Sequence, residues 1–253
     1  MTEQSYLEDS SVRRFEATVE RSLSDPPRVV LDRTQFYPEG GGQPADHGTL
    51  TAAGETWNVT NVQKRDTIYH ELDGEAPPGG TRVTGDLDWE RREAHMRYHT
   101  AQHLLSALLL AAYDAPTRGN QLYADRARID VEHGRFDEDD LATIEARMND
   151  LVDDGRPVRW YTMGREAAEA RLDTDRTRID LLPDSITELR IVEVGAPGEE
   201  PRGQVDGPGE GDVYDRTACA GTHVTDTAAV GTVSVTGRET GGSDRERLHF
   251  ELE

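Results

Sequence analysis

Two short motifs, His99-Thr-Ala-Gln-His103 and Cys219-Ala-Gly-Thr-His223, hold three histidines and the only cysteine of this chain. The first motif lies within residues 91–113, where a face rich in Leu and Ala predicts a helix. Residues i and i+4 share one face of a helix, so both rings of the first motif point the same way. Imidazole nitrogen and thiolate sulfur suit zinc, and we therefore predict that His99, His103, Cys219 and His223 bind one Zn²⁺ ion per chain.

Each motif alone is a weak signal, because two histidines one helical turn apart are more often ordinary surface or core residues. A metalloprotease helix needs a glutamate after its first histidine, and Thr100 stands there, which disfavours peptide hydrolysis. Four protein ligands are typical of a structural zinc site, whereas catalytic zinc keeps an open position, and both interpretations stay open. We interpret the remaining histidines as ordinary surface or strand residues: His47, His70, His95, His133 and His249.

Residues 1 to about 90 predict many short strands separated by turn residues, a pattern typical of a small β-barrel. Turns are expected at Asp25-Pro-Pro, Gly40-Gly-Gly, Asp73-Gly and Pro77-Pro-Gly-Gly. The expected strands carry β-branched residues and span Phe15–Val19, Arg28–Asp32, Gly48–Ala52, Trp57–Gln63, Thr67–Leu72 and Thr81–Leu87.

From residue 91 the pattern changes to mixed helices and strands. The predicted fold class is therefore α+β, with a β-barrel domain over residues 1–90 and a sheet covered by helices over residues 91–253. Asp137 is a good N-cap for a helix over Glu138–Asp153, and residues 196–211, rich in Gly, Pro and Glu, predict an exposed loop. Other expected elements are a short helix at Glu166–Leu172 and strands at Arg126–Glu132, Val158–Thr162, Glu188–Val194, Asp212–Arg216, Val230–Thr236 and Arg245–Leu252.

The chain is strongly acidic, with 50 Asp and Glu against 28 Lys and Arg and a formal net charge of -22. The acidic residues are spread between apolar segments, which favours a folded protein over a disordered tail. We interpret the charge as adaptation to a very salty cytoplasm, as in a halophilic archaeon, because a Debye length of roughly 3 Å at about 1 M salt screens the self-repulsion. An ordinary acidic protein is the alternative. Since neither a secretory signal nor a membrane-length apolar run is visible, we expect a soluble, cytoplasmic protein, with a monomer favoured.

Two further segments carry a family resemblance: Phe36-Tyr-Pro-Glu-Gly-Gly-Gly-Gln-Pro-Ala-Asp-His-Gly48 and Gly119-Asn-Gln-Leu-Tyr-Ala-Asp125-Arg-Ala-Arg-Ile-Asp130. Together with the two histidine motifs, and in the same order, they resemble the editing domain of alanyl-tRNA synthetases and its free-standing relatives, the AlaX proteins. The histidine motifs alone also resemble editing-type domains of threonyl-tRNA synthetases, and the glycine-rich segment favours the alanyl branch. The resemblance implies a zinc-binding aminoacyl-tRNA editing domain over residues 91–253.

By this resemblance the chain is a medium-length AlaX protein that acts in trans, because 253 residues leave no room for an aminoacylation core. Its implied substrate is tRNA(Ala) mischarged with serine, with glycine as an additional candidate, cleaved at the ester to the 3′-terminal adenosine. The acidic charge is compatible with a tRNA partner, since phosphate attraction is weak for every protein in concentrated salt. The alternatives are a noncatalytic, zinc-stapled tRNA-binding module and editing of Ser-tRNA(Thr).

The resemblance also indicates residues that would contact the substrate. Serine differs from alanine by a hydroxyl, and a site that hydrogen-bonds this group can prefer serine strongly. Thr117 is the first candidate to bind that hydroxyl and Gln121 the second, with a solvated loop as the alternative for both. The candidates for substrate binding through the glycine-rich segment, which could equally form a tight turn, are Gly40, Gly41, Gly42 and Gln43. The candidates for tRNA contacts, with ion pairs as the alternative, are Arg91, Arg92, Arg97 and Arg118.

Overall fold

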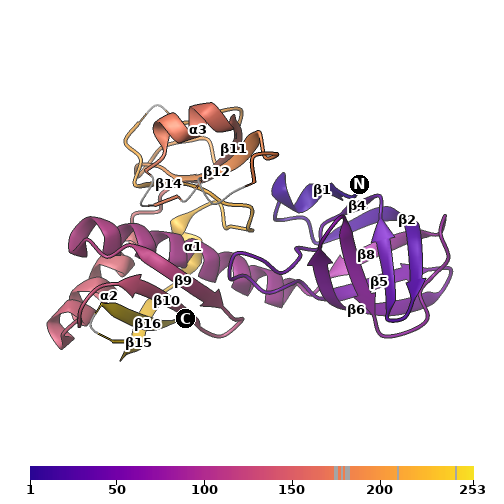
Figure 1. Cartoon of the computed structure of the whole chain (residues 1–253), viewed down its shortest axis with the longest axis horizontal. Coiled ribbons are helices and arrows are strands. Elements are labelled where there is room, and N and C mark those ends of the chain that lie inside the picture. The colour runs from indigo at the N-terminus through magenta and orange to yellow at the C-terminus, as the bar shows by residue number, and fades with distance from the viewer. Residues whose placement is uncertain (174–175, 178, 180–182, 210, 243) are drawn as a thin grey trace. The chain divides into compact units, whose positions relative to one another are not determined.

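A computed structural model describes residues 1–173, 176–177, 179, 183–209, 211–242 and 244–253. The chain forms two compact units, residues 1–95 and residues 96–253. A long helix, α1 (Trp89–Tyr113), begins in the first unit and continues into the second (Figure 1). The predicted α+β class with an N-terminal barrel is confirmed.

Six strands of the first unit close into a barrel in the order β2-β3-β7-β6-β5-β8 (Figure 1), and all neighbours in it are antiparallel. Each of the six predicted strands is present. A parallel pair, β1 (Glu3–Gln4) and β4 (Arg33–Thr34), and the short helix η1 (Ser5–Leu7) complete the unit's regular elements among the described residues. The barrel strands are β2 (Arg14–Ser24), β3 (Pro27–Leu31), β5 (Gly48–Ala52), β6 (Glu55–Lys64), β7 (Ile68–Leu72) and β8 (Arg82–Leu87).

The barrel interior includes one histidine, His70 on β7. Ile68, His70 and Leu72 are buried in alternation with half-buried neighbours, which is the period of two expected for a strand with one face on the core. His70 is fully buried, with Nε2 2.8 Å from the hydroxyl of Thr34 and Nδ1 3.3 Å from the carbonyl oxygen of Val29. Burial lowers the pKa of His70 from 6.5 to about 4.

We expect this histidine to make the protein less stable in mild acid. Above pH 6.5 His70 is neutral in both the folded and the unfolded chain, so its contribution is fully present. Between pH 6.5 and about 4 only the unfolded chain binds the proton, which removes about 3 kcal/mol of stability across that window. Urea unfolding at pH values on both sides of the window measures the loss. The variant His70→Gln should show a loss smaller by that amount, and an identical loss in both proteins would contradict the assignment.

A buried ion pair anchors the glycine-rich segment within the first unit. Arg92 is fully buried and Asp46 is 1% exposed. The Nε of Arg92 donates to both carboxylate oxygens at 3.2 and 3.0 Å, and its other nitrogens donate to the carbonyl oxygens of Ser10 and Gln35. Asp46 also accepts the backbone N–H of Tyr37 at 2.7 Å. The segment before β5 is therefore fixed to the first turn of α1, and Arg92 serves the fold, as the ion-pair alternative for this residue predicted.

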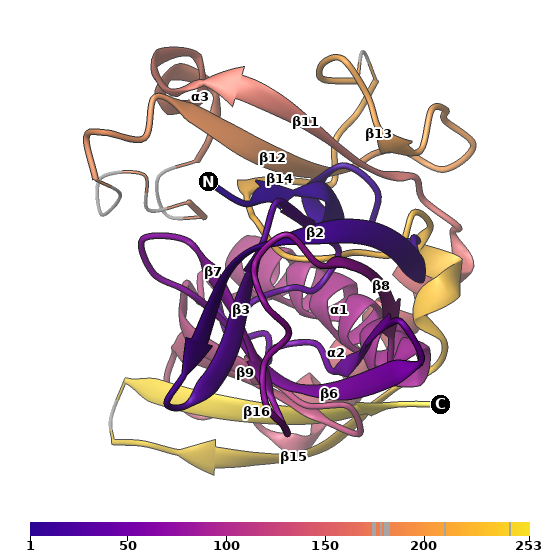
Figure 2. The same cartoon turned by 90° about the vertical axis from the view of Figure 1, so that its right-hand side faces the viewer.

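The first sheet of the second unit has the order β15-β16-β10-β9 and is antiparallel. Helix α1 packs on it, because the Tyr98 hydroxyl accepts the N–H of Leu252 at 3.1 Å and its ring lies 6.0 Å from that of Phe250. Figure 2 shows β15 and β16 side by side at the yellow end of the colour scale. The strands are β9 (Thr117–Leu122), β10 (Ala127–Glu132), β15 (Val233–Thr240) and β16 (Arg245–Leu252).

The second sheet has the order β13-β11-β12-β14, and α1 runs between the two sheets (Figure 1). The hydroxyl of Tyr214, just before β14, lies 3.4 Å from the carbonyl oxygen of Leu104 on α1. Helix α2 (Glu138–Asp153) begins at the predicted cap, where Asp137 and Asp140 form a reciprocal capping box. Among the described residues, the remaining elements are β11 (Val158–Gly164), α3 (Arg165–Arg171), β12 (Glu188–Val194), β13 (Gly203–Gln204), β14 (Asp215–Ala218) and η3 (Thr227–Val230).

Several predicted elements differ from those observed. Residues 117–122 form a strand rather than a solvated loop, because they pair with β10. Strand β14 begins at Asp215 instead of Asp212, and β15 begins after η3 at Val233. The predicted loop 196–211, of which residue 210 lies outside the described residues, contains β13, which pairs with β11. The interpretation of His95 as a surface or strand residue is wrong, since it is fully buried on α1.

Within the described part of the chain, we find no helix with the length and apolar character that crossing a membrane requires.

Candidate metal centre

The two histidine motifs come together in the second unit. One ligand atom from each of His99, His103, Cys219 and His223 lies within 4.8 Å of all the others. Helix α1 presents the first two rings one turn apart, with centroids 5.2 Å from each other, while Cys219 directly follows β14. The three imidazoles are at most 4% exposed. Residues far apart in the sequence thus form one cluster of three buried imidazoles and a half-buried cysteine.

The donor atoms and two of the separations between them fit a tetrahedral zinc site, while the widest separation in the cluster is within 4.8 Å. The Sγ atom of Cys219 lies 3.5 Å from Nε2 of His99 and 3.4 Å from Nε2 of His223. Zinc bonds of about 2.0–2.3 Å place tetrahedral ligand atoms about 3.3–3.8 Å apart. Three imidazoles and one thiolate are also donors that zinc accepts readily. The residues present therefore fit the ion that the sequence motifs predict.

The electrostatics of the cluster favour the ligating protonation states of Cys219 and His223. Burial raises the pKa of the Cys219 thiol, but the charges of His99, His223 and His103 outweigh it and hold that pKa well below its usual value. Burial, reinforced by His99, lowers the pKa of His223 well below its usual value. Burial also lowers the pKa of His103, but the Cys219 thiolate and Asp215 outweigh it and leave that pKa raised. A thiolate and a neutral imidazole are the forms that bind metal, so binding releases a proton from any ring still charged.

The loop that carries Cys219 is fixed by Arg190 on β12. The Nη1 atom of Arg190 donates to the carbonyl oxygens of Cys219 and Gly221 at 2.9 and 3.0 Å. In return, the backbone N–H of Cys219 donates to the carbonyl oxygen of Arg190 at 3.0 Å. The N–H of Gly221 donates to the Sγ atom at 3.3 Å, which favours the thiolate. The sulfur is thereby held in place from the backbone and from β12.

Two of the rings contact polar groups through their Nδ1 atoms. The hydroxyl of Thr100, itself fully buried, lies 3.2 Å from Nδ1 of His223. The carboxylate of Asp215 lies 3.3 Å from Nδ1 of His103. Burial raises the pKa of Asp215, but Arg176 and His103 outweigh it and hold the pKa at about 2. These contacts leave the Nε2 atoms of both rings for a metal.

Asp215 and Arg176 were not among the site residues predicted from the sequence. A signal for Asp215 exists, because it stands four residues before Cys219 and alternate residues of a strand share a face. The sequence contains no comparable signal for Arg176, whose contact with Asp215 depends on the tertiary fold.

Both candidates for reading the substrate hydroxyl lie on β9. The hydroxyl of Thr117 pairs with that of Ser106 on α1. Ser106 lies three residues after His103, and residues at this spacing are neighbours on a helix, about 5–6 Å apart at Cβ. Thr117 is therefore beside the helix segment that supplies the ligands. Gln121 is half-buried, and its amide donates to the carbonyl oxygen of Leu122 at 3.2 Å.

The glycine-rich segment forms a tight turn in the first unit. The N–H of Gly40 donates to the carbonyl oxygen of Gln43 at 3.0 Å, and the N–H of Gln43 donates back at 2.9 Å. Gly41 and Gly42 have φ values of 60° and 84°, a region that favours glycine. Gly40 and Gly41 are exposed at the tip, while Gln43 is 1% exposed. The positive φ values in the turn explain why positions 41 and 42 are glycines. Backbone groups of the exposed residues Gly40 and Gly41 remain accessible at the tip of the turn.

The other candidate arginines also have partners within the chain. Arg91 donates to the carbonyl oxygen of Ala45 at 3.0 Å, and Arg97 donates to that of Val230 at 2.8 Å. Arg118 forms an ion pair with Glu132 on the neighbouring strand. These contacts favour the ion-pair interpretation over a primary role in tRNA binding.

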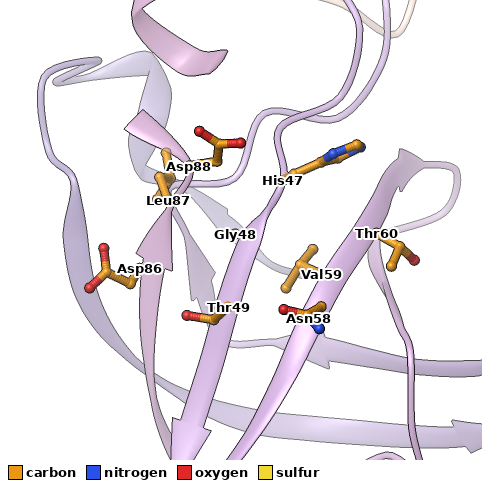
Figure 3. A pocket seen from close by; sticks show the side chains of 9 residues that line it. All are labelled: His47, Gly48, Thr49, Asn58, Val59, Thr60, Asp86, Leu87 and Asp88. Atoms are coloured by element: carbon orange, nitrogen blue, oxygen red, sulfur yellow. The ribbon is translucent and has the colours of Figure 1, made fainter. Parts of the chain in front are cut away.

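A hollow of about 480 Å³ lies on the first unit (Figure 3). Its side chains come from β5, β6 and β8 and from the residues beside them, and Figure 3 shows Asp86 and Thr49 on adjacent strands. The carboxylate of Asp88 accepts the N–H of Arg91 at 3.2 Å and so caps α1. The hollow shares no residue with the metal cluster.

Known proteins similar to this chain decide its family. An alanyl-tRNA editing protein AlaX-M of Methanosarcina barkeri is 38% identical over 259 residues, covering 100% of this chain and 99% of that protein. The chain belongs to the AlaX-M family. An AlaX-M protein of Methanosarcina acetivorans is 36% identical over 261 residues, with 100% and 99% of the two chains covered. The resemblance inferred from the motifs is therefore confirmed.

The AlaX-M chain is also similar to part of the synthetases. An alanine–tRNA ligase of Methanothrix thermoacetophila is 38% identical over 226 residues, which are 88% of this chain and 23% of the ligase. The family model for class II (A) tRNA synthetases matches residues 8–91. Similarity to the ligase therefore extends beyond the barrel into the unit that holds the metal cluster.

Proposed function

We propose that this AlaX-M protein is a trans-acting, zinc-dependent hydrolase that deacylates Ser-tRNA(Ala), with Gly-tRNA(Ala) as a second substrate. Membership of a family of alanyl-tRNA editing proteins supports hydrolysis of an aminoacyl-tRNA ester. The observation that carries the proposal is the convergence of His99, His103, Cys219 and His223 in one cluster. In this proposal residues 1–90 are the barrel domain and residues 91–253 the editing domain.

His99, His103 and Cys219 would hold the zinc ion, with His223 as the fourth and most readily displaced ligand, which would give the ion the open position that catalysis needs. When bound, zinc acts as a Lewis acid that can polarise a carbonyl or lower the pKa of water. The protein's own part is to fix the ligands in place and to favour the thiolate of Cys219. Arg190 and the N–H of Gly221 hold the thiolate, while Thr100 and Asp215 contact the rings of His223 and His103. Such fixed, buried ligands reduce the reorganisation that a reaction would otherwise require.

We propose that the side chain of Thr117 forms a hydrogen bond with the hydroxyl of the seryl group. Its contact with Ser106, one turn along α1 from His103, supports this role. A hydroxyl pair can exchange its internal hydrogen bond for one to the substrate. An alanyl group offers no hydroxyl and gains no such hydrogen bond, so the seryl ester is favoured over the correctly charged tRNA. Gln121 stays the second candidate.

Replacing Thr117 by valine should slow deacylation of Ser-tRNA(Ala) about tenfold, because one neutral hydrogen bond to the substrate is lost. Thr117→Ser keeps the hydroxyl and should retain most of the rate. Single-turnover release of labelled serine measures both. If Thr117→Val is as fast as the unchanged protein, Thr117 does not read the hydroxyl, and Gln121→Leu is then the variant expected to be slow.

A panel of four aminoacylated tRNAs tests the proposed substrate. We expect rapid release of serine from Ser-tRNA(Ala), slower release of glycine from Gly-tRNA(Ala), and little reaction of Ala-tRNA(Ala) or Ser-tRNA(Thr). Faster cleavage of Ser-tRNA(Thr) would show a threonyl-type editor instead. Binding of tRNA(Ala) without hydrolysis of any ester would show a noncatalytic, zinc-stapled module.

A further inference from the structure

The buried carboxylate of Asp215 contacts the ring of His103, one of the proposed metal ligands, on the side away from its Nε2 atom. The Oδ2 atom of Asp215 lies 3.3 Å from Nδ1 of His103, and the two side chains are 3% and 5% exposed. Arg176 donates to both oxygens of this carboxylate, from Nε at 2.8 Å and from Nη2 at 2.7 Å. The same Nη2 lies 3.3 Å from the carbonyl oxygen of His103. Contacts thus run from Arg176 through Asp215 to the imidazole of His103.

The strand geometry explains how these groups meet. Asp215 is the first residue of β14, and Cys219 follows its last residue while keeping the pairing to Arg190. Residues i, i+2 and i+4 of an extended strand share one face, so Asp215, Thr217 and Cys219 point the same way. The hydroxyl of Thr217 is buried against that of Thr177, the neighbour of Arg176. Strand β14 and the residue after it therefore place the proposed ligand Cys219 on the same face as Asp215, whose carboxylate contacts the ligand His103.

We infer that Asp215, oriented by Arg176, is a positioning residue that fixes the ring of His103 and presents its Nε2 atom to the metal. A carboxylate behind a metal-bound histidine sets its tautomer, limits its rotation and makes it a stronger ligand. The bidentate contact with Arg176 holds the carboxylate in one orientation, because a guanidinium offers donors in a fixed fork. The inference rests on the proposed metal centre and adds to it a residue that is not itself a ligand.

Zinc affinity of the full chain tests this role directly. Asp215→Asn preserves the shape of the side chain and removes its charge, and we expect the Kd for Zn²⁺, measured by competition with a chromophoric chelator, to rise about 10- to 100-fold. The matched control is Asp125→Asn, which removes an exposed carboxylate lying 3.0 Å from Arg126 and should leave the Kd unchanged. The ligand-field spectrum of bound Co²⁺ should also shift in Asp215→Asn and not in the control.

A double-mutant cycle separates positioning from a general structural role. If Asp215 acts through His103, its replacement should no longer change zinc affinity once His103→Ala has removed the ring. A merely structural carboxylate would weaken binding equally in both backgrounds. Where Asp215→Asn does not fold, Arg176→Met keeps the carboxylate but frees it to rotate, and we expect its Kd to rise about tenfold.

The outcomes distinguish this inference from the metal centre on which it rests. If His103→Ala abolishes tight zinc binding but Asp215→Asn, or Arg176→Met in its place, binds zinc within about twofold of the unchanged chain, the positioning role is overturned and the metal centre stands. If His103→Ala itself leaves zinc stoichiometry and affinity unchanged, the metal centre is overturned.

Discussion

Replacement of Cys219 by alanine is expected to slow deacylation of Ser-tRNA(Ala) by about 10³-fold or more. The substitution removes the only thiolate of a cluster whose ligand atoms lie within 4.8 Å of one another. A catalytic metal supplies several kcal/mol of transition-state stabilisation, and each 1.4 kcal/mol or so changes the rate tenfold. His103→Ala should have an effect of similar size, because it removes a ligand from the opposite motif. Single-turnover rates and zinc content per chain are the two measurements.

A histidine outside the cluster provides the matched control. His249 lies on β16, with its side chain 32% exposed and 3.2 Å from Glu239. We expect His249→Ala to keep both the bound zinc and the rate. Undiminished deacylation by Cys219→Ala, in a preparation shown to lack zinc, would refute a role for the cluster in the reaction.

The second large effect concerns the barrel unit and its glycine-rich segment. Arg92→Met should destabilise the protein by about 3–5 kcal/mol, because it leaves the carboxylate of Asp46 buried without its partner. Three carbonyl or carboxylate groups, on Ser10, Gln35 and Asp46, lose their donor at once. The turn at Gly40–Gln43 should become more mobile, since Asp46 connects the end of its segment to Tyr37. Urea unfolding measures the first effect and amide exchange the second.

An exposed ion pair in the same protein provides the control for the effect of burial on the free energy of unfolding. Arg118 and Glu132 also form a pair, but their side chains are 43% and 47% exposed, so Arg118→Met should cost no more than about 1 kcal/mol. The double variant Asp46→Asn with Arg92→Met should lose less than the sum of its single variants, because the pair is coupled. A cost for Arg92→Met as small as that for Arg118→Met would contradict the anchoring role.

The barrel could be predicted from the sequence because the residue pattern within each strand and turn indicates the strand without reference to the rest of the chain. β-branched residues alternate with polar ones, and turns such as Asp73-Gly separate them, so all six strands were expected. Strand β9 was not expected, since Gly119 and Asn120 have low strand propensity. Its pairing with β10 overrides that propensity, and pairing between strands is a tertiary property.

The metal cluster was predictable for a similar reason, and its surroundings were not. Two ligands one helical turn apart, and two more flanking a short turn, are patterns visible in the sequence. The contact of His103 with Asp215, and of Asp215 with Arg176, joins three segments separated by dozens of residues. Likewise, nothing local distinguishes the buried Arg92 from the exposed Arg118. The adaptation to salt and the cytoplasmic location stay predictions.

The most direct test of zinc-dependent deacylation is the rate at which serine leaves Ser-tRNA(Ala) in the presence of the purified chain, before and after removal of its zinc. We predict fast release by the zinc-loaded protein, a loss of about 10³-fold after chelation with the fold intact, and recovery when one equivalent of Zn²⁺ per chain is returned. Release at the original rate by folded protein without zinc would contradict the proposed function.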